Sequence, residues 1–106
     1  MTANPNAPNE DGVTPIFWAA NKGHTEIVKI LAPLTDKPNA PDKDGVTPIF
    51  WAAHKGHEEI VKILAPLISN PNAPNKDGKT PTHCAMQNGH TEIVKLLAPM
   101  KDNPNN

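Results

Sequence analysis

DGVTPIFWAA at residues 11–20 recurs unchanged at residues 44–53, and the related stretch DGKTPTHCAM stands at residues 77–86. The likeness extends well beyond these ten residues. Segments 11–43 and 44–76 agree at 27 of 33 positions and differ only at Asn21/His54, Thr25/Glu58, Thr35/Ile68, Asp36/Ser69, Lys37/Asn70 and Asp42/Asn75. A fixed period of this length is typical of repeat proteins, in which each unit packs on its neighbours.

The period divides the chain into a leader and three units. Residues 1–10 match the end of a repeat, and residues 11–43, 44–76 and 77–106 are the first, second and third repeats. The third repeat keeps the glycines, the Thr-Pro pair and the Glu-Ile-Val-Lys run but changes the segment between them. Because both ends fall at equivalent points of the repeat, the sequence looks cut or designed on repeat boundaries.

Each repeat carries the signals of a short first helix. Thr14-Pro15, and the same pair one and two repeats later, combine a hydroxyl N-cap with proline at the first helical position, where its missing N–H costs nothing. Gly23 and its equivalents provide the left-handed residue that ends a helix. We therefore expect a helix of about two turns between these signals.

A second helix is predicted over residues 25–31, 58–64 and 91–97. Its first turn contains a glutamate and its last turn a lysine, an order that suits the helix dipole. Pro33, Pro66 and Pro99 then remove a backbone donor, so we expect the helix to stop near Ala32 or its equivalents. The proline-rich linker that follows leads to an Asp-Gly turn, which predicts a projecting finger.

Two short helices and a turn are too small to bury their own apolar side, whereas stacked copies bury a continuous core. About three copies are the practical minimum for stability, and this chain has three. The predicted fold is therefore an all-α solenoid of three helix-turn-helix repeats with projecting β-turn fingers.

The pattern DGxTPxxxAAxxGHxEIVKxL over residues 11–106 resembles the ankyrin repeat, whose signature is Thr-Pro-Leu-His-x-Ala. The first two repeats have Phe17 and Phe50 at the position of the family histidine, and only the third repeat keeps it, as His83. We expect an apolar substitute for that histidine's polar contacts. The family's glycine after the second helix is also replaced, by Thr35, Ile68 and Lys101, so we expect the linker to deviate from the common shape.

The resemblance implies a non-catalytic protein-interaction module that binds through the concave face made by the finger tips and first helices. The residues that match the family's variable contact positions are Asn9, Glu10, Asp11, Val13, Asn21 and Lys22 in the first repeat, Lys43, Asp44, Val46, His54 and Lys55 in the second, and Lys76, Asp77, Lys79, Gln87 and Asn88 in the third.

Composition narrows the classes of partner. Ten Lys and Arg residues against eleven Asp and Glu residues give a net charge of −1, without the basic stripe that binding to nucleic acid requires. The apolar runs are far shorter than the ~20 residues of a membrane span, so no membrane partner is expected. One cysteine, Cys84, and no secretory signal favour a cytoplasmic or nuclear location.

Five histidines raise the possibility of a metal site. His24, His57 and His90 lie one repeat apart, about 10 Å for packed helices, whereas zinc needs its ligands at ~2 Å. His54 and His57 flank Gly56, but no carboxylate or cysteine in that repeat completes a tetrahedral set. We therefore expect no metal, no cofactor and a structural role for the Gly-His sites, with a histidine-based metal-binding protein as a distant alternative.

Two other residue types have competing interpretations. Trp18 and Trp51 are candidate binding anchors, but we favour stacking of the indoles from repeat to repeat along the first helices. Whether Phe17 and Trp18 point into the stack or outward is left open. Cys84 is a poor nucleophile candidate because its neighbour His83 points elsewhere on a helix. The sequence predicts no catalytic residues and no enzyme activity.

The two ends differ in polarity. In the third repeat, Val46, Ile49, Phe50, Trp51 and Ala53 are replaced by Lys79, Thr82, His83, Cys84 and Met86. The first repeat is nearly identical to the second and has no such polar replacements, so we expect a mostly monomeric protein with weak end-to-end association through that end. Two functional hypotheses remain: a natural interaction module, or an engineered, consensus-like scaffold with no native partner.

Overall fold

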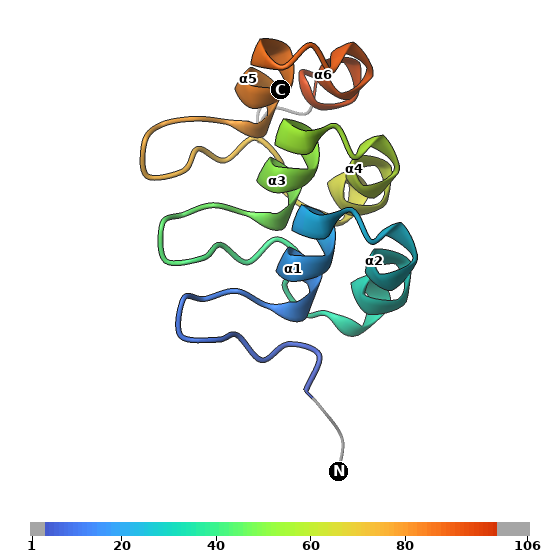
Figure 1. Ribbon diagram of the computed structural model, residues 1–106, viewed down its shortest axis with the longest axis vertical. Helices are drawn as coiled ribbons and strands as arrows, with labels where there is room; N and C mark the ends of the chain where they lie inside the picture. Colours follow the sequence, from blue (N-terminus) through green and yellow to red (C-terminus); the bar gives the residue numbers. More distant parts are fainter. Residues whose placement is uncertain (1–3, 100–106) are drawn as a thin grey trace.

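The computed structural model describes residues 4–99 and consists of three helix pairs stacked in one direction. The pairs are α1 (Pro15–Lys22) with α2 (Thr25–Leu31), α3 (Pro48–Lys55) with α4 (Glu58–Leu64), and α5 (Pro81–Gln87) with α6 (Thr91–Leu97). Figure 1 shows the fingers on one side, the inner helices α1, α3 and α5 in the middle, and the outer helices on the other side. Residues 4–99 contain no strand, so the predicted all-α solenoid is confirmed.

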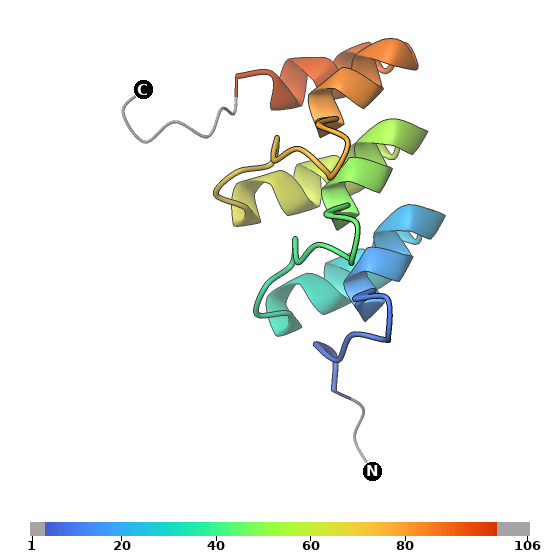
Figure 2. The same cartoon turned by 90° about the vertical axis from the view of Figure 1, so that its left-hand side faces the viewer.

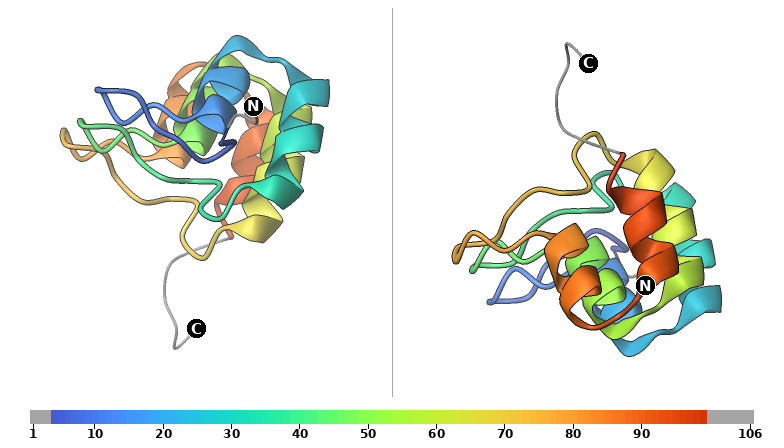
Figure 3. Two further views of the ribbon diagram at one scale, coloured as in Figure 1. Left: turned by 90° about the horizontal axis from the view of Figure 1, so that it is seen from below. Right: turned by 90° about the horizontal axis from the view of Figure 1, so that it is seen from above.

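The molecule is elongated, with extents of 43 × 26 × 25 Å. Turned by 90°, the helix pairs are seen as three successive layers with the linkers crossing between them (Figure 2). Viewed along the stack, the three fingers project together beyond the inner helices (Figure 3). The C-terminal part of the predicted third repeat, residues 100–106 with Lys101, and residues 1–3 of the leader lie outside the described residues.

The expected helix signals act as predicted. The Thr14 hydroxyl accepts a hydrogen bond from the backbone N–H of Phe17 at 3.2 Å, and Thr47 and Thr80 cap α3 and α5 in the same way. Gly23 and Gly56 adopt the left-handed conformation directly after α1 and α3, at φ 78° and 80°. After α5, Asn88 is the C-cap, and Gly89 follows it at φ 74°. These caps limit each inner helix to seven or eight residues.

The prolines after α2 and α4 lie in a short 3-10 turn that follows each helix directly. Helix α2 stops at Leu31 as expected, and a 3-10 turn, η1 (Ala32–Leu34), carries Pro33. The turn η2 (Ala65–Leu67) repeats this arrangement after α4. The Thr35 hydroxyl then donates to the carbonyl of Leu31 at 2.6 Å, which closes the turn where the family has glycine.

Burial at equivalent positions shows how the repeats cover one another. Ile60 and Ile93 are 0% and 2% exposed, whereas Ile27, at the same position of the first repeat, is 40% exposed. On the opposite side of the layer it is the last repeat that is exposed. Ala20 and Ala53 are fully buried, whereas Met86 at the equivalent position is 57% exposed. Ile60 and Ile93 are thus each covered by the repeat that precedes them.

A glycine-histidine contact also joins successive repeats. A Cβ atom added to Gly23 would lie 2.8 Å from the His57 ring, and one added to Gly56 would lie 2.7 Å from the His90 ring. The missing side chain therefore makes room for the histidine of the next repeat. This is a structural role for the Gly-His sites, although it acts across repeats rather than as a side-chain cap on the second helix.

The aromatic residues of α1 and α3 have different surroundings. Phe17 and Phe50 are buried, as expected for an apolar replacement of the family histidine, whereas Trp18 is 48% exposed. The predicted stacking of Trp18 on Trp51 is wrong. The centroids of the Trp18 and His24 rings lie 4.9 Å apart, and Trp51 contacts the rings of Phe50 and His54 in its own repeat.

Removing the same side chain at a covered and an uncovered position tests the stacking. We expect Ile60→Ala to lower the free energy of unfolding by about 2–5 kcal/mol, because it leaves a cavity between repeats. Ile27→Ala removes a partly exposed side chain and should cost about 1 kcal/mol or less. Urea unfolding followed by circular dichroism measures both variants. Equal losses would show that the second repeat does not depend on the first for its burial.

A second matched pair tests the glycine-histidine contact. Gly56 and Gly89 both have positive φ, at 80° and 74°, but a Cβ at Gly89 meets no atom within 4 Å. Alanine at either position should cost about 1–2 kcal/mol of backbone strain. We expect Gly56→Ala to cost about 1 kcal/mol more, because the His90 ring must move. Equal unfolding midpoints for the two variants would contradict this.

Candidate functional site

The finger tips are shaped by an acceptor side chain at the start of each turn. The Asn9 carboxamide oxygen accepts hydrogen bonds from the backbone N–H groups of Asp11 and Val13, both at 2.9 Å. Asp42 and Asn75 do the same in the next two fingers. Gly12 and its equivalents have φ near 80°, as the predicted tight turn requires. Asn9 therefore serves its own turn, although the sequence suggests it as a contact residue.

Neighbouring fingers are joined by a ladder of backbone and ionic contacts. The N–H of Lys43 donates to the carbonyl of Asp11 at 2.9 Å, and its ammonium lies 2.9 Å from the Asp11 carboxylate. Lys76 makes the same two contacts with Asp44, at 3.0 and 3.2 Å. Hydrogen bonding to Asp11 and the charge of that carboxylate raise the pKa of Lys43. Exposed ion pairs add little stability, so their main effect is to align the tips.

A second row of contacts runs along the C-terminal ends of the inner helices. The Lys55 ammonium donates to the Asn21 side-chain oxygen of the preceding repeat. The same ammonium lies 5.4 Å from the centre of the Trp51 ring, within reach of a cation–π interaction. These contacts hold the Lys55 ammonium over the half-buried indole of Trp51, so that a charged group and an apolar ring lie side by side on α3.

The corresponding contact between the second and third repeats uses an amide and two histidines. The Asn88 amide donates to the carbonyl of His54 at 2.9 Å and lies 3.2 Å from its Nδ1 atom. The Nε2 atom of His90 lies 3.1 Å from the same carbonyl. The His54 ring also stacks on Phe50, with centroids 6.2 Å apart. His54 is thereby held at the junction of two repeats.

The two rows define what we call the finger-helix surface. Figure 3 shows the fingers and inner helices together on the side away from the outer helices. The exposed members suggested by the sequence are Glu10, Asp11, Lys22, Lys43, Asp44, Lys55, Lys76, Asp77, Lys79, Gln87 and Asn88, and the half-buried ones are Val13, Asn21, Val46 and His54. Eight of them contact a neighbouring finger or helix pair through side chains: Asp11, Lys43, Asp44, Lys76, Asn21, Lys55, His54 and Asn88.

Sequence reasoning misplaced Trp51, which belongs to this surface rather than to an indole stack. The signal that identifies it is the spacing Trp51-x-x-x-Lys55, because residues four apart share one face of a helix. His90 was also missed as a partner of the row. Its contact spans 36 positions along the sequence and has no local signature.

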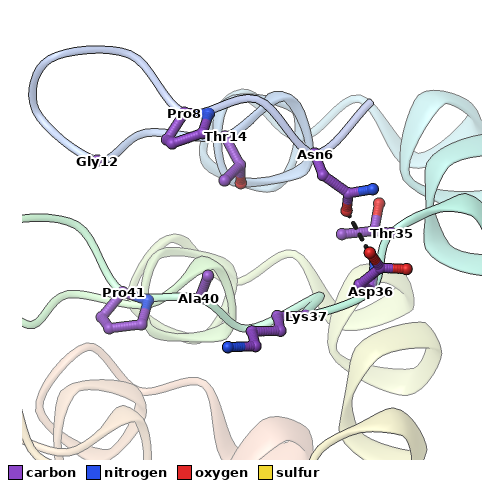
Figure 4. A pocket seen from close by; sticks show the side chains of 9 residues that line it. All are labelled: Asn6, Pro8, Gly12, Thr14, Thr35, Asp36, Lys37, Ala40 and Pro41. Carbon is purple, nitrogen blue, oxygen red and sulfur yellow. Dashed lines mark hydrogen bonds between the residues drawn. The ribbon is translucent and has the colours of Figure 1, made fainter. Parts of the chain in front are cut away.

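A groove of about 320 Å³ lies between the leader and the first linker (Figure 4). Pro8, Ala40 and Pro41 contribute its apolar lining, and the Asn6 side-chain oxygen accepts from the Asp36 N–H at 2.8 Å across it. A similar groove, of about 300 Å³, lies between residues 36–41 and 67–69. Because the groove recurs with the repeat, we interpret it as the spacing between successive linkers.

The described residues offer little for chemistry on a substrate. Cys84 is buried, and this burial raises the pKa of its thiol, which lowers the thiolate fraction at neutral pH. Its sequence neighbour His83 is exposed. Within residues 4–99, no group of three or more His, Cys, Asp or Glu side chains is arranged to hold a metal ion. None of the helices in that range has the length and apolar character needed to cross a membrane.

The reactivity of Cys84 follows from its burial. We expect the native protein to react with an aromatic disulfide reagent at least about tenfold more slowly than the urea-unfolded chain, because the thiol is inaccessible and protonated. Absorbance of the released thiol reports both rates. A native rate equal to that of the unfolded chain would contradict the burial and reopen the possibility of a reactive cysteine.

The repeat architecture agrees with comparison to known families. The family described as ankyrin repeats (3 copies) matches residues 1–75 and 33–106, which together span the chain. Comparison with curated proteins finds no significant match. Proteins built of ankyrin repeats are generally protein–protein interaction modules and typically are not enzymes. With its capped helix pairs, its aligned fingers and a family match over its whole length, this chain belongs to the ankyrin repeat family.

Proposed function

We propose that this chain binds a protein partner through the finger-helix surface, the concave face expected from the family. This proposal is supported by the ion pairs and hydrogen bonds that join neighbouring fingers and helix pairs on that surface. These contacts hold its side chains at fixed spacing. A preorganised surface binds without a large loss of side-chain freedom. The ion pairs of the outer helices, such as Lys29 with Glu26, lie within single helices and do not join neighbouring repeats.

The middle repeat supplies the strongest candidate anchor. Trp51 is half-buried, with Lys55 over its ring and Phe50 against its edge. Tryptophan is enriched among residues that carry most of the binding energy at interfaces. Around it, the paired charges of the finger ladder form a polar rim of both signs. A partner with an apolar side chain at its centre and polar groups around it fits this surface.

An engineered or consensus-like scaffold without a native partner is the alternative function. The observation that favours it is the agreement of the first two repeats at 27 of 33 positions, including the candidate contact positions Val13 and Val46. A surface selected for one partner usually differs from repeat to repeat. The single buried thiol fits a reducing compartment, so we propose a cytoplasmic or nuclear location for a natural module.

A pull-down with a combined variant separates the two hypotheses. Lys43→Ala, Val46→Ala, His54→Ala and Lys55→Ala together remove the centre of the surface and should weaken a specific partner about tenfold or more. The matched control is Glu59→Ala with Lys95→Ala on the outer helices. Specific capture lost only in the first variant supports the interaction module. No reproducible capture, or equal loss in both variants, contradicts binding through this surface.

A further inference from the structure

We propose that the first repeat presents a second docking surface at the N-terminal end of the stack, and that its occupant is another ankyrin-type helix pair with a basic finger tip. This surface, here called the N-terminal face, consists of Trp18, Ile27 and Ile30. They are 48%, 40% and 64% exposed. It adjoins the finger-helix surface at Trp18, the equivalent of Trp51, and it does not depend on the function proposed for that surface.

The N-terminal face duplicates a surface that is already covered inside the molecule. Trp51, Ile60 and Ile63 occupy the equivalent positions of the second repeat, with identical side chains one period later. There Ile60 is fully buried, and Trp51 and Ile63 are at least partly covered. Leu34 shows that missing coverage is the cause, because it is 55% exposed and its interior equivalent Leu67 is 50% exposed.

The internal interface also shows what covers such a face. The covering side of the first repeat contributes Phe17, Ala20 and Val28, all buried once the second repeat is in place. Helices approach closely at Ala20 because its side chain is small. A repeat that presents phenylalanine, alanine and valine at these positions therefore fits the N-terminal face in the same way.

The finger tip adds a requirement for charge. In the ladder, Asp11 pairs with Lys43 and Asp44 with Lys76, so the aspartate of one finger meets a lysine of the next finger. The position equivalent to Lys43 in the leader is Glu10. A preceding finger with an aspartate at the position of Asp11 would place that carboxylate next to the carboxylate of Glu10. A lysine or arginine at the aspartate position would instead form the ion pair with reversed sign.

The chain's own last repeat is a poor occupant on both counts. Its covering side has His83 and the larger, exposed Met86 in place of phenylalanine and alanine. Its finger has Asp77, which would face Glu10 of a second copy. This double mismatch explains why we expect end-to-end association of the unmodified chain to be weak despite its exposed apolar end.

The test converts the last repeat into a matching occupant. His83→Phe with Met86→Ala restores the covering side, and Asp77→Lys adds the basic tip. We expect the triple variant to assemble head to tail with a dissociation constant at least about tenfold lower than that of the unmodified chain. Sedimentation equilibrium measures the association, and circular dichroism confirms that each variant keeps its helix content. A triple variant that stays as monomeric as the unmodified chain overturns the proposal.

Charge swaps at Glu10 separate specific docking from general stickiness. With Asp77→Lys present, Glu10→Lys should weaken assembly about threefold, and with Asp77 retained it should strengthen assembly by a similar factor. Both effects should shrink at high salt. Ile27→Asp should abolish assembly in either background. Glu10 effects of the same sign in both backgrounds, or assembly that survives Ile27→Asp, contradict docking at the N-terminal face.

Discussion

Packing of each helix pair against the preceding one is the constraint on which this structure depends. The helices are seven or eight residues long, far below the roughly 12–15 residues at which isolated helices become marginally stable in water. Caps such as Thr14 and Gly23 set where they begin and end, but caps alone do not bury apolar surface. Ile60 and Leu64 become fully buried only because a neighbouring layer lies on them. Stability is therefore a property of the interfaces between repeats.

The same interfaces determine the candidate binding surface. Lys43 reaches Asp11 of the preceding finger, and Asn88 reaches His54 of the preceding helix pair. Such links contribute little free energy individually because they are exposed. Their effect is geometric: fingers and helix ends that belong to different repeats become one continuous surface. A change in the packing between layers would therefore shift the spacing of every contact residue on it.

The local elements were predictable from the sequence because their signals are local. The Thr14-Pro15 start, the Gly23 end and the Pro33 stop each act within a few residues, and the structure confirms them. The direction of Trp18 was not predictable. The segment from Ile16 to Ala20 is entirely apolar, so periodicity does not distinguish the buried face of the helix from its edge. The contact of His57 with Gly23 spans 34 positions and also escaped local reasoning.

Because the repeats are nearly identical, the same side chain can be compared at an end and in the interior of the array. A difference in its exposure then reports the effect of the neighbouring repeat. Ile27 and Ile60 share the same side chain and helix position, and only the preceding layer distinguishes them. At the other end, Met86 shows how a sequence change adapts a face that no described helix pair covers. Glu10 is a corresponding change in charge: it stands at the position where the later fingers have the lysine that pairs with a preceding aspartate. We therefore expect the residues at the two ends to restrict which neighbours the stack accepts.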